Sequence, residues 1–278
     1  MGKTAKQPIE RGKLRLWLGI GYFRLRRYAK WITGGTRFAR ERGSSRMAFV
    51  AYRHQTPLLR KLSQVDMRLQ HNKVRNLLIA VRAVDGIVVK PGETFSYWRL
   101  IGKPTRRKGY VDGMILSNGR VTEGTGGGLC QLSNLIYWMT LHTPLAVTER
   151  HRHSYDVFPD ANRTQPFGSG ATCYYNYVDL QIYNPTKQAF QLCVALSETH
   201  LAGEWRSEST VPFSYEIYEK EHRIAQQSWG GYTRHNVLHR SVFGAGGERV
   251  RDEYVTENHA LMMYSSLLAS GSDKEKRG

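Results

Sequence analysis

The chain has 278 residues, 40% of them hydrophobic and 11% aromatic, which excludes a wholly disordered protein and allows a packed core. Three cysteines (Cys130, Cys173 and Cys193) are too few for a disulfide framework, so we expect free thiols. The formal net charge is +18, and residues 1–61 hold 16 of the 41 Lys and Arg but only two of the 23 acidic residues. This basic segment indicates an anionic partner: phospholipid, a cell-wall polymer or nucleic acid.

Residues 11–32 predict a basic amphipathic helix. Its apolar runs are shorter than the roughly seven residues of a signal sequence and the roughly 20 of a membrane span, so we expect neither. Two interpretations stay open: a helix lying on an anionic membrane, or a helix packed on the body of the protein. The first makes the protein cytoplasmic or peripheral on the inner face of the membrane. Nucleic acid is not an expected partner, because no helix-turn-helix, zinc-finger or RRM signature is present. The apolar face combines Leu14, Trp17, Leu18, Leu25, Tyr28 and Ile32.

The rest of the chain predicts an α+β fold: basic N-terminal helices, a mixed core with one buried helix after a Gly-rich turn, and a β-rich C-terminal half. A second helix is expected over residues 63–84, where apolar residues recur at helical spacing. We divide the chain into a basic arm (1–62), a core domain (63–198) and a β-rich extension (199–278). Expected strands are 87–89, 94–98, a hairpin over 114–121, 145–148, 154–158, 172–183 and 190–196, with a hairpin turn at 201–203.

The segment "GTGGGLCQLSNLIYWMTLH" places three glycines shortly before Cys130 and a helix over residues 129–142. The cysteine falls in the first helical turn, opposite the apolar stripe, together with Ser133, Asn134 and Tyr137. Unpaired N–H groups and the helix dipole there favour a thiolate and an oxyanion. We therefore interpret Cys130 as a nucleophile; the alternative is a buried small apolar residue. Cys173 and Cys193 lie in apolar alternating runs and are expected in the core.

The segment "ERHRHSYD" supplies candidate bases for that thiol. His151 and His153 are two residues apart and would share one face of a strand. Asp156 or Asp160 would orient the histidine in a Cys–His–acid arrangement. An alternative is a zinc site formed by Cys130, His151 and His153, although a fourth spaced ligand is missing. The leading interpretation involves no metal and no cofactor.

Four segments resemble the VanW family, named for a gene of glycopeptide-resistance clusters: "PGETFSYWRLIG" (91–102), "GGGLCQLSNLIYWMTLHTPL" (126–145), "ERHRHS" (149–154) and "VDLQIYNPT" (178–186). The resemblance implies L,D-transpeptidase-like acyl transfer or hydrolysis on peptidoglycan stem peptides, or on a lipid-linked precursor. Cys130 would form a thioester with His153 as its base. Residues that would shape the acyl pocket and oxyanion site are Gly126, Gly127, Gly128, Gln131, Ser133 and Asn134.

Two observations limit what this resemblance implies. The family often has Gly-x-Asp-Ala-Thr where this chain has "GSGAT" (168–172), so Gly170 replaces an acid that could orient a histidine. Peptidoglycan cross-linking also takes place outside the cytoplasm, whereas no exporting segment is expected here. A non-catalytic protein that binds a cell-wall peptide or precursor in the same groove therefore remains the alternative function.

Overall fold

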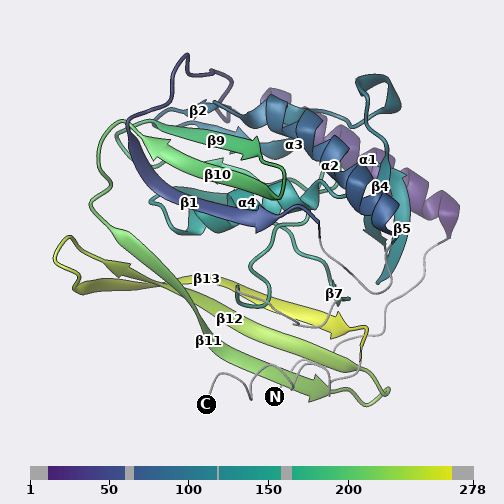
Figure 1. Cartoon of the computed structure of the whole chain (residues 1–278). Helices are drawn as coiled ribbons and strands as arrows, with labels where there is room; N and C mark the ends of the chain where they lie inside the picture. Colours follow the sequence, from purple (N-terminus) through teal and green to yellow (C-terminus); the bar gives the residue numbers. More distant parts are fainter. Residues whose placement is uncertain (1–11, 60–65, 118, 158–164, 265–278) are drawn as a thin grey trace.

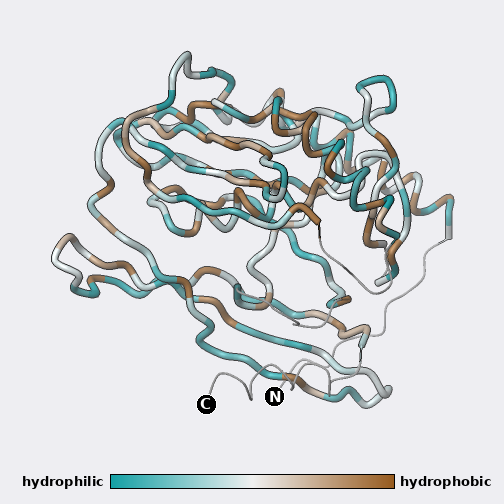
Figure 2. Tube along the Cα trace, viewed as in Figure 1, coloured by the Kyte–Doolittle hydropathy of each residue, from teal (hydrophilic) through white to brown (hydrophobic). Residues whose placement is uncertain are grey.

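The computed structural model describes residues 12–59, 66–117, 119–157 and 165–264. They form an upper body of helices and short strands and a lower, strongly twisted sheet (Figure 1). Hydrophobic residues are concentrated in the upper body, and the lower sheet is more hydrophilic (Figure 2). The fold is mixed α+β with a β-rich C-terminal half, which confirms the predicted class.

An antiparallel sheet of order β1-β10-β9-β2 forms the centre of the upper body. Helix α2 packs against β9, and α4 packs against β10 and β1. The buried Trp205 ring on β10 donates its Nε1–H to Thr140 Oγ1 of α4 at 3.0 Å. The sheet combines strands from all three predicted segments. The elements are β1 (Phe49–Pro57), β2 (Val88–Val89), β9 (Phe190–Leu196), β10 (His200–Ser207), α2 (Met67–Val84) and α4 (Cys130–Leu141).

Two smaller sheets and two short helices complete the body. A sheet of order β3-β8-β6 lies beside the centre, and β4 and β5 form the predicted hairpin. Pairing of β3 with β8 brings two segments of the VanW resemblance, residues 91–102 and 178–186, side by side. They are β3 (Thr94–Ser96), α3 (Tyr97–Ile101), η1 (Arg106–Lys108), β4 (Asp112–Ser117), β5 (Arg120–Thr125), β6 (Ala146–Glu149) and β8 (Gln181–Tyr183).

The lower sheet has the order β11-β12-β13-β7, with long antiparallel strands and the short β7 parallel to β13. Arginine side chains join it to the body. Arg240 Nη1 donates to the carbonyl oxygens of Leu141 and Thr143 at the end of α4, at 3.2 and 3.1 Å. The strands are β7 (Tyr155–Asp156), β11 (Ser214–Gln226), β12 (Tyr232–Phe243) and β13 (Arg249–Met262).

Three expectations about local structure are wrong. Residues 201–203 are not a turn but lie inside β10; the turn precedes them, where Ser197 Oγ accepts the N–H groups of Thr199 and His200. Of the expected strand 172–183 only β8 forms. Residues 97–98, the end of the expected strand 94–98, instead begin α3.

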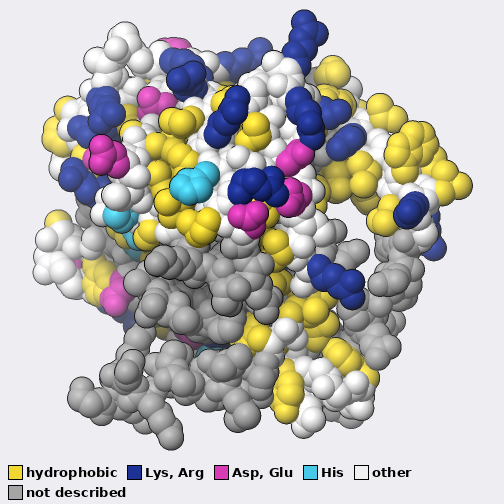
Figure 3. All heavy atoms as spheres, turned by 45° about the vertical axis from the view of Figure 1, so that its right-hand side comes forward, with side chains coloured by type: hydrophobic (Ala, Val, Ile, Leu, Met, Phe, Trp, Pro, Cys, Tyr) yellow, Lys and Arg dark blue, Asp and Glu magenta, His cyan; other side chains and the backbone are white. Residues whose placement is uncertain are grey.

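Helix α1 (Lys13–Thr33) contacts the body through Arg27 and through aromatic side chains such as Phe23 and Trp31, and not through the leucines of its predicted apolar face. Arg27 is buried, and its guanidinium forms a bidentate ion pair with Glu149. It also donates to the Tyr177 carbonyl at 2.9 Å. The predicted apolar face is exposed. Hydrophobic side chains gather on the right-hand side of Figure 3, where α1 lies. The helix thus packs on the body, as one of the two interpretations expected, with this face outward; exposed fractions reach 71% for Leu14, 72% for Leu25 and 83% for Ile32.

The Arg27–Glu149 pair should hold α1 on the body. Replacing Arg27 with Met leaves a largely buried carboxylate without its cation, which costs about 3 kcal/mol. We expect faster hydrogen exchange of the backbone amides of residues 13–33, by about 100-fold if α1 opens locally. Arg26→Met, on the neighbouring exposed position, is the control and should leave the exchange unchanged. Equal exchange rates in both variants would contradict this role.

Candidate functional site

Cys130 is the first residue of α4 and the only one of the three cysteines that is partly exposed; Cys173 and Cys193 are buried, as predicted. The residue before it, Leu129, is fixed because the buried Tyr97 hydroxyl donates to its carbonyl oxygen at 2.8 Å. The helix therefore begins at a defined position. In its first turn, the N–H groups of Gln131 and Leu132 donate to the carbonyl oxygens of Gly128 and Leu129, both at 3.1 Å, and the expected oxyanion role of this helix end stays a prediction.

The sulfur of Cys130 faces protein groups as well as solvent. Its Sγ lies 3.8 Å from the carbonyl oxygen of Cys173. Burial raises the pKa of the Cys130 thiol above its ordinary value. This direction is opposite to the expected thiolate, because desolvation of the charged form outweighs the backbone hydrogen bonds that lower the pKa of the thiol. Within the described parts of the chain, neither His151 nor His153 makes a hydrogen bond to this sulfur.

The glycines before Cys130 allow close packing of the chain against itself. A Cβ on Gly127 would lie 2.2 Å from the backbone of Gly113, and one on Gly128, whose φ is +90°, would lie 2.2 Å from Lys73. Buried Asn76 of α2 fixes the turn: its Nδ2 donates to the Gly127 carbonyl at 2.9 Å. These glycines thus set the position of α4 against α2 and β4. Their predicted role in binding substrate stays a prediction.

Three other predicted binding residues have partners within the chain. Gln131 Nε2 donates to Thr56 Oγ1 and the Pro57 carbonyl of β1, at 3.0 and 2.9 Å. Ser133 Oγ donates to the carbonyl of Ala171, and Asn134 Oδ1 accepts the N–H of the same residue, both at 2.7 Å. Ser133 and Asn134 therefore hold the loop at Ala171 against α4.

This loop joins the thiol to the histidine segment. The N–H of Thr172 donates to the carbonyl of His151 at 2.8 Å, and the carbonyl of the next residue, Cys173, accepts from the thiol of Cys130. One short segment therefore contacts both the start of α4 and the backbone of His151. The structure brings together the regions of the predicted nucleophile and base, although their reactive atoms do not touch.

Glu149 is the acid that contacts His151. Its Oε1 lies 3.1 Å from His151 Nε2 and accepts the N–H of Asp179 at 3.2 Å, and its two oxygens bind Arg27. Burial opposes ionisation, but the hydrogen bonds from His151 and Arg27 and the charge of Arg27 lower the pKa of Glu149 to about 2. The carboxylate is therefore ionised at neutral pH and can fix the ring of His151 with Nδ1 directed elsewhere.

Asp179 links this pair to the segment "PGETFSYWRLIG". Its carboxylate accepts Ser96 Oγ–H at 2.5 Å and the N–H groups of Trp98 and Leu180 at 2.9 and 3.0 Å. Burial, partly offset by these hydrogen bonds, raises the pKa of Asp179 to about 6. Such a buried acid ties backbone segments together rather than reacting with a ligand.

The other predicted catalytic residues lie toward the lower sheet. Asp156, on β7, is buried, accepts the hydroxyl of Tyr264 at 2.7 Å and lies 3.6 Å from Arg234; its role in orienting a histidine stays a prediction. Asp160 lies outside the described residues. Burial and the charge of Arg152 lower the pKa of His153. His153 lines a groove of about 460 Å³ between the body and β13; its chemically active lining residues are Arg150, His151, Arg152, His153, Glu257 and His259.

Sequence reasoning did not find Glu149, Arg27 or Asp179. Glu149 is the first residue of "ERHRHS", close to the predicted bases His151 and His153. The residue that pairs with it, Arg27, is 122 positions away in the chain. The alternation of acid and histidine at positions 149 and 151 was the available signal, since residues two apart share a face of a strand.

The site is thus a partly exposed thiol at the start of a buried helix, beside an acid–histidine pair, in a mixed α+β body. A family model described as "VanW like protein" matches residues 72–206. The vancomycin B-type resistance protein VanW of Enterococcus faecalis is 31% identical over 237 residues, 85% of this chain and 86% of that protein. The Bacillus subtilis protein YoaR is 38% identical over 88 residues, 31% of this chain and 29% of that protein. No solved structure matches the chain. The chain belongs to the VanW family.

The raised pKa of Cys130 predicts slow alkylation of its thiol at neutral pH. Because the thiolate is the reactive form, the iodoacetamide rate should keep increasing as pH rises from 7 to beyond 9. Peptide mapping by mass spectrometry measures this rate for each cysteine. Cys193, which is buried, is the internal control and should react more slowly at every pH. A plateau of the Cys130 rate below pH 8 would contradict the assignment.

Proposed function

We propose that the chain catalyses acyl transfer on peptidoglycan stem peptides through Cys130. The observation that supports this most is the loop of residues 171–173, which contacts both the start of α4 and the segment carrying the Glu149–His151 pair. The name of the Enterococcus relative refers to vancomycin resistance, which supports a role in cell-wall remodelling or glycopeptide resistance for this chain.

In this proposal His151 is the base, and Glu149 is a positioning residue. His151 takes the proton of the Cys130 thiol, and the sulfur attacks the acyl carbon of the donor stem peptide. The C–N bond of the donor breaks, the leaving amine receives the proton from the imidazolium, and a thioester remains. The amine of an acceptor stem then attacks the thioester, the C–S bond breaks, and the amine proton passes through the imidazole to the leaving thiolate, which restores the Cys130 thiol. Water in place of the amine gives hydrolysis.

The acyltransferase is tested by incubating the protein with purified muropeptides and measuring its intact mass. We expect a hydroxylamine-sensitive adduct on Cys130 that is absent from Cys130→Ala. His151→Gln should slow adduct formation by about 100-fold. His153→Gln is the matched variant, and a larger loss there would transfer the role of base to His153. No adduct on the wild-type chain would contradict acyl transfer.

A second candidate function is the binding of a cell-wall peptide or lipid-linked precursor without chemistry. The raised pKa of Cys130 and the groove lined by Arg150 and Arg152 favour it, since these arginines suit carboxylate or phosphate groups of the ligand. Calorimetry with the same muropeptides separates the two functions. Equal affinity of wild-type and Cys130→Ala protein, with no adduct, would support binding alone.

We further propose that α1 places the protein at an anionic membrane surface. Within the described part of the chain, helices fall short of the combined length and apolarity needed to cross a bilayer. Leu14, Leu18, Leu25 and Ile32 fall within about 40° of one another around the helix and are exposed. Exposed basic residues lie along one flank of this stripe, which suits a helix lying in the interface; they are Arg15, Arg26 and Lys30.

Vesicle co-sedimentation tests this surface. The protein should bind phosphatidylglycerol vesicles more tightly than phosphatidylcholine vesicles, and less tightly at 0.5 M salt than at about 0.05 M. Leu25→Ser should weaken binding roughly tenfold, because an apolar side chain no longer enters the lipid. Leu16→Ser, on the opposite side of α1, is the control and should have a smaller effect. If deletion of residues 1–36 leaves binding unchanged, α1 is not the contact.

A further inference from the structure

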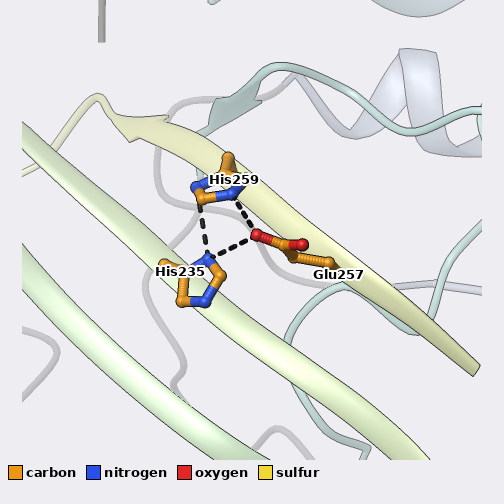
Figure 4. A group of neighbouring side chains, drawn as sticks. All are labelled: His235, Glu257 and His259. Atoms are coloured by element: carbon orange, nitrogen blue, oxygen red, sulfur yellow. Dashed lines mark hydrogen bonds and ion pairs between the residues drawn. The ribbon is translucent and has the colours of Figure 1, made fainter. Parts of the chain in front are cut away.

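Two histidines and a glutamate form a cluster on the lower sheet, outside the site described above. His235 on β12 is directly opposite His259 on β13, and Glu257 is two residues before His259 and so on the same face. Their side chains point toward one another in Figure 4. His235 Nδ1 lies 3.2 Å from His259 Nδ1 and 3.7 Å from Glu257 Oε1, which is 2.7 Å from His259 Nε2.

These spacings suit a metal ion. One donor atom from each residue can be chosen so that all three lie within 4.8 Å of one another. Donors around a tetrahedral ion with bonds of about 2.0–2.1 Å lie about 3.3–3.4 Å apart, so small side-chain rotations would complete the geometry. Two imidazoles and one carboxylate are a donor set typical of divalent transition metals such as zinc, with a fourth position left open.

One histidine of the cluster is held within the sheet, and the other is accessible to solvent. His235 is mostly buried, with 15% of its side chain exposed, whereas 65% of the His259 side chain is exposed. An ion could therefore enter from solvent and meet a ligand already held by the sheet. On the neighbouring strand β11, the charge of Glu221 raises the pKa of His235 and the charge of Arg223 lowers it. These two effects oppose each other, so β11 adds little net charge beside the cluster.

The cluster also borders the groove between the body and the lower sheet. Glu257 and His259 line this groove together with His151, His153 and Arg150. We propose that His235, Glu257 and His259 bind one divalent transition-metal ion at the edge of this groove. The open coordination position would be taken by water, because Glu257 and His259 alternate along β13 with Thr256 and Asn258, which contact Arg150 of the body, and so lie on the other face of the sheet. This site differs from the Cys130, His151 and His153 zinc site considered from the sequence.

Titration of tag-free, EDTA-treated protein with ZnCl₂ alone tests the proposal. Calorimetry should give one site per chain, and His235→Gln and His259→Gln should each weaken it by about tenfold or more. His239→Gln is the matched control from the same strand and should retain the site. Cys130→Ala should also retain it. Substitution with Co²⁺ should give the intense visible absorption of a four-coordinate ion in the wild-type protein and in these two control variants, but not in His235→Gln or His259→Gln.

Several outcomes would overturn the metal site. They are the absence of stoichiometric Zn²⁺ binding, binding that both His235→Gln and His259→Gln leave unchanged, and binding that Cys130→Ala abolishes. Circular dichroism of each variant verifies that the fold is retained. Because the titration contains no peptide, its result is independent of whether Cys130 transfers an acyl group.

Discussion

The carboxylate of Glu149 is the contact on which the arrangement of this protein depends. It holds Arg27 of α1, the ring of His151 and the backbone of Asp179, so three segments far apart in the chain meet at one side chain. A largely buried charge requires such partners, since a carboxylate without them would lose its hydration free energy and gain no hydrogen bonds or ion pairs in return. The same contacts that anchor α1 therefore also orient the proposed base.

The carboxylate of Glu149 contacts both α1, the proposed membrane contact, and His151, the proposed base. The exposed apolar stripe of α1 is presented outward because the opposite side of the helix is occupied by the Arg27 ion pair. The acid–histidine pair, in turn, lies beside the loop that contacts Cys130. A protein that attaches to a membrane through α1 would thus hold its thiol at a fixed position relative to lipid-linked substrates. The partly desolvated thiol suits a nucleophile that becomes reactive only when a substrate and a base complete the site.

Much of the fold follows from local sequence patterns. The helix after the glycines, α2 and the β4–β5 hairpin are predicted because apolar spacing and turn residues specify them within one segment. Residues 201–203 were misassigned since the small Gly203 suggests a turn, whereas in β10 it makes room for Met139 of α4. Met139 is 64 positions away from Gly203 in the chain, so no local sequence pattern could reveal this contact.

The candidate site, too, has some features that the local sequence predicts and others that depend on the folded structure. The partial exposure of Cys130 and its place in the first helical turn follow from the sequence around it, but its raised pKa depends on burial by parts of the chain that the fold brings in. Glu149 was overlooked because aspartates near the histidines seemed the natural partners, and only the docking of α1 shows which carboxylate is held. The cluster of His235, Glu257 and His259 depends on strand register, which two separated strands do not specify locally.

A double-mutant cycle between Arg27 and Glu149 tests the central contact most directly. Urea unfolding of the wild type, Arg27→Met, Glu149→Gln and the double variant gives the coupling free energy. We predict a coupling of about 2 kcal/mol or more, because each single change leaves the other group buried without its partner. Additive effects of the two substitutions would show that Glu149 does not join α1 to the site.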